Sequence, residues 1–366
     1  MFFNPTTQTF LVALAWFALA PTGVCADEQT LDSGKQKDTD SQSDDRNFQN
    51  KTFKKDDRMS ATFVEADLGK AVFESVKTWS SFRKANLREA VFRESSFVGV
   101  DFRDGNLEMA RFVKCVLPAA RFLGANCRQI TFTNCSNVCA VDFSDANLEA
   151  GRFANCRLPA ARFVGANCSR INFANCNDIC SADFNDADLR MARFANCSLP
   201  AARFVGANCS RINFANCNDI CGADFSDADL EMARFVNCEL PAARFTGANC
   251  KQINFNNCKI TSSADFSDAD LELAVFSHCM LPNARFAGAC FRATIFRNCN
   301  LASADFRNVV FAECSLIDPD LRGADLRGAS LGDALQGGQF DCKTLYDATT
   351  KFPPGFDPVA KGLTLQ

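Results

Sequence analysis

The chain has 366 residues, with 39 basic and 43 acidic side chains, a formal net charge of −4 and a single histidine, His278. This near balance argues against a strong field for nucleic acid or a membrane surface, and one histidine argues against histidine-based catalysis or a histidine-rich metal site. Phenylalanine occurs 37 times, against one tyrosine and two tryptophans. Because phenylalanine carries no polar atom that needs a partner, this usage predicts a dry, repetitive interior.

Residues 1–26 are typical of a secretory signal peptide. An apolar stretch from Phe10 to Ala20 is followed by the small-residue pattern Val-Cys-Ala, which ends at position 26. A stretch of about eleven residues is too short to span a bilayer, and no other run is longer. We therefore expect an exported protein (periplasm, cell envelope or exterior) with no integral membrane segment in the mature chain. The alternative is a membrane-anchored lipoprotein acylated at Cys25, which would need a smaller residue before it than valine.

Two segments follow the predicted signal peptide. Residues 27–60 are rich in Asp, Lys, Ser, Gln and Thr and hold few apolar side chains, so we predict a disordered linker. In residues 61–336 an apolar side chain recurs every five residues, and we call it the centre of its five-residue unit. One extra residue is inserted at intervals of 41 residues, first before Phe143. A helix needs apolar spacings of three and four, and a strand needs two. A step of five instead predicts a coil that turns a corner every five residues.

Longer periods indicate how such coils stack. Two blocks, 142–182 and 183–223, are identical at 34 of 41 positions. Every fourth centre is phenylalanine, at alternating steps of 20 and 21 residues: Phe102, Phe122, Phe143, Phe163, Phe184, Phe204, Phe225, Phe245, Phe266 and Phe286. The residue before each centre is alternately acidic and basic, as in Asp142, Arg162, Asp183 and Arg203.

This alternation of acidic and basic residues places opposite charges next to each other only if residues about 20 apart are stacked neighbours. We therefore predict four-sided coils at the strand spacing, in which each Asp has an Arg above and below it. About fourteen coils would give a length on the order of 65–70 Å. The main effect of the charges would be to fix the register, since a slip by one coil would bring like charges together.

The repeats resemble those of the pentapeptide-repeat protein family. The segments ADLRG (324–328), ANLRE (85–89) and ADFSD (223–227) match its A(D/N)LXX signature. The resemblance implies an all-β fold, a right-handed quadrilateral parallel β-helix in which the central residue and the residue two before it point inward. Departures from the signature are cysteine centres (Cys127, Cys168, Cys209, Cys250) and polar centres in the six-residue units (Asn137, Asp178, Asp219), where Val138, Ile179 or Ile220 can point inward instead.

Cysteines form a second column. Each lies two residues before the centre of the last five-residue unit in its coil: Cys115, Cys135, Cys156, Cys176, Cys197, Cys217, Cys238, Cys258, Cys279 and Cys299. An oxidising compartment would allow disulfides between coils, although stacked side chains point in parallel and would have to bend. Buried cysteine also behaves as a small hydrophobe, and free buried thiols are the interpretation we favour. A metal site is disfavoured because no histidine accompanies the cysteines.

A column of Asn and Asp raises the question of calcium. Its members are Asn106, Asn126, Asn147, Asn167, Asp188, Asn208, Asp229, Asn249 and Asp270. Calcium sites of repetitive β-rolls crowd carboxylates on glycine-rich turns, whereas most members here are neutral amides. We expect amides that bond one another and the turn backbone, and we predict no cofactor or metal.

Residues 337–366 leave the five-residue period and are aromatic and proline-rich, as expected of a C-terminal cap; a ligand-binding tail is the alternative. No nucleophile or phosphate-loop motif is present, so no catalytic residue is assigned. The sequence favours a non-catalytic, exported structural or protein-interaction scaffold whose partner is a protein and not nucleic acid. The alternative, brought to mind by the family resemblance, is a DNA-mimicking topoisomerase-binding protein. The signal peptide and the interleaved arginines argue against it.

Overall fold

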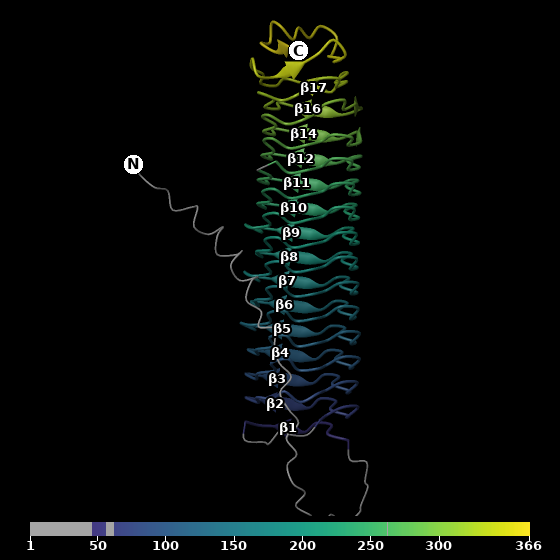
Figure 1. Cartoon of the computed structure of the whole chain (residues 1–366), viewed down its shortest axis with the longest axis vertical. Coiled ribbons are helices and arrows are strands. Elements are labelled where there is room, and N and C mark those ends of the chain that lie inside the picture. Colours follow the sequence, from purple (N-terminus) through teal and green to yellow (C-terminus); the bar gives the residue numbers. More distant parts are fainter. Residues whose placement is uncertain (1–45, 56–61, 262) are drawn as a thin grey trace, which may run out of the picture. The chain divides into compact units, whose positions relative to one another are not determined.

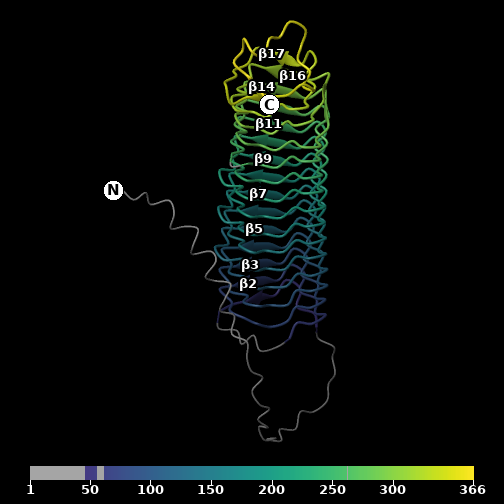
Figure 2. The same cartoon turned by 45° about the horizontal axis from the view of Figure 1, so that its top comes forward.

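The computed structural model describes residues 46–55, 62–261 and 263–366, and the predicted signal peptide lies outside them. The described residues form a parallel β-solenoid whose coils are stacked along one axis (Figures 1 and 2). Its main sheet has 15 strands, and every pairing in it is parallel between successive coils. The sequence predicted about fourteen coils, and the difference arises at the two ends.

The strands are short because each occupies only one side of a coil. The main sheet contains β1 (Thr52–Phe53), β2 (Val72–Glu74), β3 (Val91–Arg93), β4 (Arg111–Val113), β5 (Thr131–Thr133), β6 (Arg152–Ala154), β7 (Asn172–Ala174), β8 (Arg193–Ala195), β9 (Asn213–Ala215), β10 (Arg234–Val236), β11 (Asn254–Asn256), β12 (Val275–Ser277), β14 (Ile295–Arg297), β16 (Ser315–Ile317) and β17 (Leu335–Gln336). Two further pairs are β13 (Phe291–Arg292) with β15 (Phe311–Ala312), and β18 (Leu345–Tyr346) with β19 (Thr364–Leu365).

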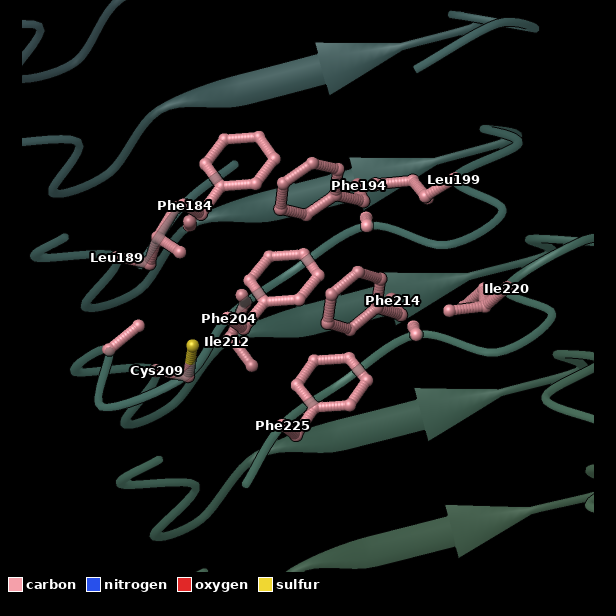
Figure 3. Close-up of a cluster of buried hydrophobic side chains, with 14 of the residues drawn as sticks. Phe184, Leu189, Phe194, Leu199, Phe204, Cys209, Ile212, Phe214, Ile220 and Phe225 are labelled. Carbon is pink, nitrogen blue, oxygen red and sulfur yellow. The ribbon is translucent and has the colours of Figure 1, made fainter. Parts of the chain in front are cut away.

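Each coil has four sides, which we number in chain order. In two successive coils the inward centres are Phe184 and Phe204 on side 1, Leu189 and Cys209 on side 2, Phe194 and Phe214 on side 3, and Leu199 and Ile220 on side 4 (Figure 3). Side 3 carries the main sheet. The other sides are joined mostly by single parallel bridges, such as Asp183 to Arg203 on side 1. The four-sided coil therefore follows the five-residue step of the sequence.

Each side ends in a residue of left-handed backbone conformation. In the coil that begins at Asp142, these are Asp145, Ala150, Asn155 and Ala160, with φ between 54° and 56°. This conformation costs roughly 1–2 kcal/mol for a residue with a Cβ. Inter-coil hydrogen bonds offset the cost: the N–H of Asp145, for example, donates to the carbonyl of Val164 at 3.0 Å. A left-handed residue at each corner thus gives the chain its turn every five residues.

Two columns of stacked phenylalanine rings fill the interior. Rings of the side 1 column from Phe102 to Phe286 lie 4.6–5.3 Å from the next ring in the column. A second column runs along side 3, and its rings meet those of side 1 edge to face, as Phe204 does with Phe214. In the six-residue units, Val138, Ile179 and Ile220 point into the interior in place of the polar centres, and all three side chains are fully buried. The interior is accordingly dry and continuous.

The solenoid begins earlier than the sequence suggested. The expected linker was to extend to residue 60, but residues 46–55 already form a coil edge. Strand β1 pairs with β2, and the ring of Phe53 stacks on that of Phe73 at 4.7 Å. Phe48 packs against Phe53 and Phe63. The two phenylalanines five residues apart are therefore the first centres of the repeat, and they bury enough apolar surface to hold this segment in place.

The C-terminal segment also stays in register beyond residue 336. Gln339, Leu345 and Lys351 form parallel bridges with the preceding coil. Beyond them, Phe352 and Phe356 stack at 4.8 Å and pack against the end of the core. Aromatic rings thus lie over the last coil, where a solenoid would otherwise expose an apolar end.

Loss of the Asp347 carboxylate should loosen this end without disturbing the coils. The Thr349 hydroxyl and the backbone N–H groups of Gly328 and Thr349 hold the pKa of Asp347 at about 2, below its ordinary value of 3.8. A depressed pKa means that the stabilisation is present above the ordinary value and is lost as pH falls through about 2. We expect Asp347→Ala at neutral pH to speed amide hydrogen exchange in residues 339–366. Unchanged exchange there in Asp347→Ala would contradict the expectation.

Candidate interaction surface

Hollows on the surface of the described residues are open depressions. One hollow, of about 580 Å³, is an open depression on the corner between sides 2 and 3. It is lined by Arg170, Arg190, Arg211 and neighbouring Ser, Met and Glu side chains. No cluster of three or more potential metal ligands occurs in the described ranges, and no helix there is long and apolar enough to cross a membrane.

The structure stacks the predicted cysteine column inside the solenoid. Cys156, Cys176, Cys197 and Cys217 are buried. The thiol of Cys176, for example, lies 3.5 Å from the carbonyl oxygen of Phe153 in the preceding coil and 3.6 Å from that of Ala174. All 20 cysteines in the described residues are free thiols. Burial raises the pKa of Cys115 to about 12, so this thiol is a poor nucleophile.

Thiol titration should therefore divide the cysteines into two groups. In the native chain the accessible thiols are Cys139, Cys180, Cys221, Cys290 and Cys342, and the other fifteen should react only as the chain unfolds. Denaturation without reductant should then release 20 reactive thiols from the mature chain. A lower number in the denatured chain would show that some coils are joined by disulfides.

The predicted Asp and Arg column is stacked as expected, but its side chains do not pair. Asp142 forms a backbone bridge with Arg162, which forms another with Asp183. Within the described ranges, no ion pair joins Asp142 or Asp183 to Arg162 or Arg203 of the adjacent coils. The Asp142 carboxylate instead accepts hydrogen bonds from the N–H and hydroxyl of Ser144, at 3.0 and 2.6 Å. The predicted stacking of Asp and Arg is therefore present, while the carboxylate binds the N–H two residues ahead, which it reaches more easily than the next coil.

Aspartates followed two residues later by arginine form ion pairs within one side. Arg103 binds Asp101 at 2.7 Å, and this contact lowers the pKa of that carboxyl. Arg190 with Asp188 and Arg307 with Asp305 repeat the arrangement. The sequence signal for these ion pairs is the pattern Asp-x-Arg.

Two columns of amides run along the solenoid. On side 2 the amide of Asn106 donates to the side chain of Asn86 at 3.2 Å, and that of Asn126 to Asn106 at 3.0 Å. These bonds fit the expected amide stack rather than a calcium site. The other column lies exposed at the corner between sides 3 and 4, where Asn155 and Asn175 bond at 3.2 Å. Sequence analysis missed this column, although an Asn-Cys dipeptide marks it in successive coils.

Two rows of exposed charges repeat every 41 residues. The acidic row, at the corner that ends side 1, consists of Asp104, Asp145, Asp186, Asp227 and Asp268. The basic row, at the start of side 3, consists of Arg111, Arg152, Arg193 and Arg234. In the described part of the chain, the one ion pair of either row joins Asp104 to Arg83 at 3.5 Å. The remaining charges are free to meet a partner outside the chain.

Neutral residues separate the charges within each row. In the acidic row the intervening residues are Gly124, Gly165, Gly206 and Gly247. A Cβ at Gly206 would lie 2.8 Å from Oδ1 of Asp186, so the carboxylate lies over the space left by the missing side chain. In the basic row the intervening residues are Thr131, Asn172 and Asn213. The charges of both rows therefore recur at every second coil, about 9.6 Å apart at the strand spacing.

Comparisons with known proteins point to one family. The family model described as Pentapeptide repeats matches the chain in eight copies, over residues 78–108, 142–177, 182–218, 223–261, 262–298 and 294–333. The search of curated proteins finds no match.

Several solved structures resemble the chain. The pentapeptide repeat protein alr5209 from Nostoc PCC 7120 is 30% identical over 28% of this chain and 84% of its own, with a TM-score of 0.21. HetL, a pentapeptide repeat protein involved in heterocyst differentiation regulation from Nostoc sp. strain PCC 7120, is 20% identical over 68% and 88%, with a TM-score of 0.17. QnrB1, a plasmid-mediated fluoroquinolone resistance protein, is 17% identical over 58% and 93%, with a TM-score of 0.21.

Proposed function

The chain belongs to the pentapeptide-repeat family, and on that premise we propose that it is a non-catalytic, exported scaffold that binds protein along its outer sides. The observation that carries this proposal is the pair of charged rows, whose members are exposed and mostly lack a partner within the described residues. Charged rows on a rigid support favour binding by electrostatic complementarity. The interior contributes no chemistry to this function, because its side chains are apolar and its thiols are buried.

The proposed export rests on the sequence pattern of residues 1–26. Cell fractionation with N-terminal sequencing is the direct test, and we expect a mature chain that begins at Asp27 and is recovered outside the cytosol. A mature protein that retains Cys25 as an acylated first residue would support the lipoprotein alternative. A full-length chain in the cytosol would overturn the export proposal.

A DNA-mimicking topoisomerase binder is the weaker candidate. Such a mimic needs a long surface dominated by negative charge. On side 1 the half-buried Asp142 and Asp183 alternate with the exposed Arg162 and Arg203, and the basic row runs along side 3. These arginines interrupt any continuous acidic surface, so the charge pattern supports a scaffold for another kind of protein.

The partner can be sought by capture with the tagged mature chain, from an envelope or secreted fraction and, in parallel, from a cytosolic fraction. We expect a protein captured reproducibly from the envelope or secreted fraction. Loss of the partner with Arg152→Glu, Arg193→Glu and Arg234→Glu would assign binding to the basic row. Reproducible capture of a cytosolic topoisomerase alone would contradict the proposal and favour the mimic.

A further inference from the structure

The acidic and basic rows have the same spacing. Consecutive members of each row are 41 residues apart, which corresponds to two coils. A row of carboxylates and a row of guanidinium groups with a common spacing can pair at every position along two solenoids that lie side by side. Charge rows of unequal spacing would match at one point and then drift out of register. The equal period therefore indicates a partner with the repeat of this chain itself.

The positions of the rows within the coil also match. Side 1 and side 3 lie opposite each other in a four-sided coil, and side 2 separates them. The acidic row lies at the end of side 1 and the basic row at the start of side 3, so both rows border side 2. A second copy moved sideways without rotation would place its side 3 against side 1 of the first. Its basic row would then meet the acidic row along one common edge.

The rest of the two sides is compatible with close approach. The residues that follow the side 3 phenylalanines are small, as in Ala154, Ala174, Ala195 and Ala215. At the far edge of side 3, the exposed amides of the Asn155 and Asn175 column would face the alternating Asp and Arg of side 1. Amides donate and accept hydrogen bonds, so they suit a neighbour of either charge.

Unsatisfied polar groups fall on the same two sides. Within the described residues, three buried side-chain oxygens lack a hydrogen-bond partner: Oδ1 of Asn172, Oδ1 of Asn213 and Oγ1 of Thr246. The two asparagines lie on side 3, between the arginines of the basic row, and the threonine lies on side 1. A buried polar atom without a partner is unusual in a native chain.

We propose that side 3 of one copy of this chain docks against side 1 of another, with Arg152, Arg193 and Arg234 paired to Asp145, Asp186 and Asp227. The interface uses different surfaces on the two copies, so each docked pair leaves one side 1 and one side 3 free. Such contacts continue instead of closing, and the copies form an open lateral row. The inference rests on the proposed scaffold function, for which it names one partner, a second copy.

Sedimentation velocity of the mature chain tests the proposal. At an ionic strength of about 0.05 M we expect species that grow with protein concentration, and at about 0.5 M a single small species, because salt screens exposed charges. Reversal of the basic row (Arg152→Glu, Arg193→Glu, Arg234→Glu) should weaken association about a hundredfold, since three attractions become repulsions. Reversal of the acidic row (Asp145→Lys, Asp186→Lys, Asp227→Lys) should do the same. Lysine is acceptable at these corners, because Lys70, Lys84 and Lys114 already have positive φ.

Mixing the variants separates specific docking from a general effect of charge. Each triple variant should stay dispersed alone, whereas a one-to-one mixture, or one chain carrying both reversals, should assemble again. The control is Lys77→Glu, Arg157→Glu and Lys259→Glu on side 4, which alters net charge as much as the basic-row reversal and should leave assembly intact. Circular dichroism establishes that each variant is folded.

The outcomes distinguish this inference from the scaffold function. A wild-type chain that stays monomeric at low salt, or assembly that survives both reversals, would overturn lateral docking. The capture experiment above is independent of that result, because it reports partners other than a second copy. If no other protein is captured but the chain assembles in a salt-sensitive manner, self-association is the activity of this surface.

Discussion

Replacing Phe204 by alanine is expected to lower the free energy of unfolding by about 3–5 kcal/mol. The ring is fully buried and stacks between Phe184 at 5.0 Å and Phe225 at 4.6 Å. It also meets Phe194 and Phe214 edge to face, at 6.2 and 6.1 Å. Alanine would leave a cavity in the middle of both phenylalanine columns, and the backbone of a stacked coil cannot collapse to fill it.

Urea denaturation of Phe204→Ala beside two controls measures the effect. Phe204→Leu keeps most of the apolar volume and should cost less than the alanine variant. Arg203→Ala removes an exposed neighbouring side chain and should change the free energy of unfolding by no more than about 0.5 kcal/mol. Because a repeat contacts mainly its neighbours, faster hydrogen exchange should concentrate in the coils around Phe204. A loss below about 1 kcal/mol for Phe204→Ala would contradict the packing account.

The architecture could be predicted from sequence because its period is strict. A five-residue step excludes a helix and a flat strand, and the phenylalanine column from Phe102 to Phe286 indicates the number of residues in one coil. The stacking partners of Asp142 followed from the same count. Repetition makes such predictions possible, since one correct register determines all the others.

Side-chain partners could not be predicted in the same way. Asp142 and Arg162 are stacked neighbours as predicted, but the repeat does not show which group the Asp142 carboxylate binds. The carboxylate has a closer donor in the N–H of Ser144, and that preference depends on the local turn and not on the repeat. The two charged rows were missed because the alternation was sought only beside the side 1 centres. Arg152 and Asp145 belong to different sides, and their relation appears only when the coil is closed.

The sequence pattern also did not predict where the solenoid begins and ends. Residues 46–55 were predicted as part of a disordered linker because polar and charged side chains dominate residues 27–60, yet Phe53 continues the side 3 column. Near the other end, residues 339–351 lose the repeat signature but keep the backbone bridges. Backbone pairing can therefore continue where the side-chain period stops.

The second large expected effect concerns the 41-residue period. Deleting residues 183–223 joins Ala182 to Asp224, the equivalent of Asp183 one period later. Every column then stays in phase, so the shortened chain should fold and unfold cooperatively. Deleting the single coil 183–202 joins Ala182 to Arg203 and removes half as many residues, but it stacks coils that are not normally neighbours.

The single-coil deletion should be the more damaging of the two. It brings Arg162 next to Arg203, and like charges on adjacent strands are destabilising. It also stacks Cys168 on Cys209 where leucine normally separates them, which leaves unfilled volume worth about 1–3 kcal/mol. We expect a lower urea midpoint for this deletion than for the 41-residue deletion.

Small-angle X-ray scattering of the 183–223 deletion tests the central claim, that two coils of 41 residues form the repeating unit of a rigid solenoid. The account predicts a folded chain whose maximum dimension is shorter by about 9.6 Å, the height of two coils at the strand spacing. Its thermal unfolding should remain cooperative. An unfolded chain, or a folded chain of unchanged length, would contradict the claim.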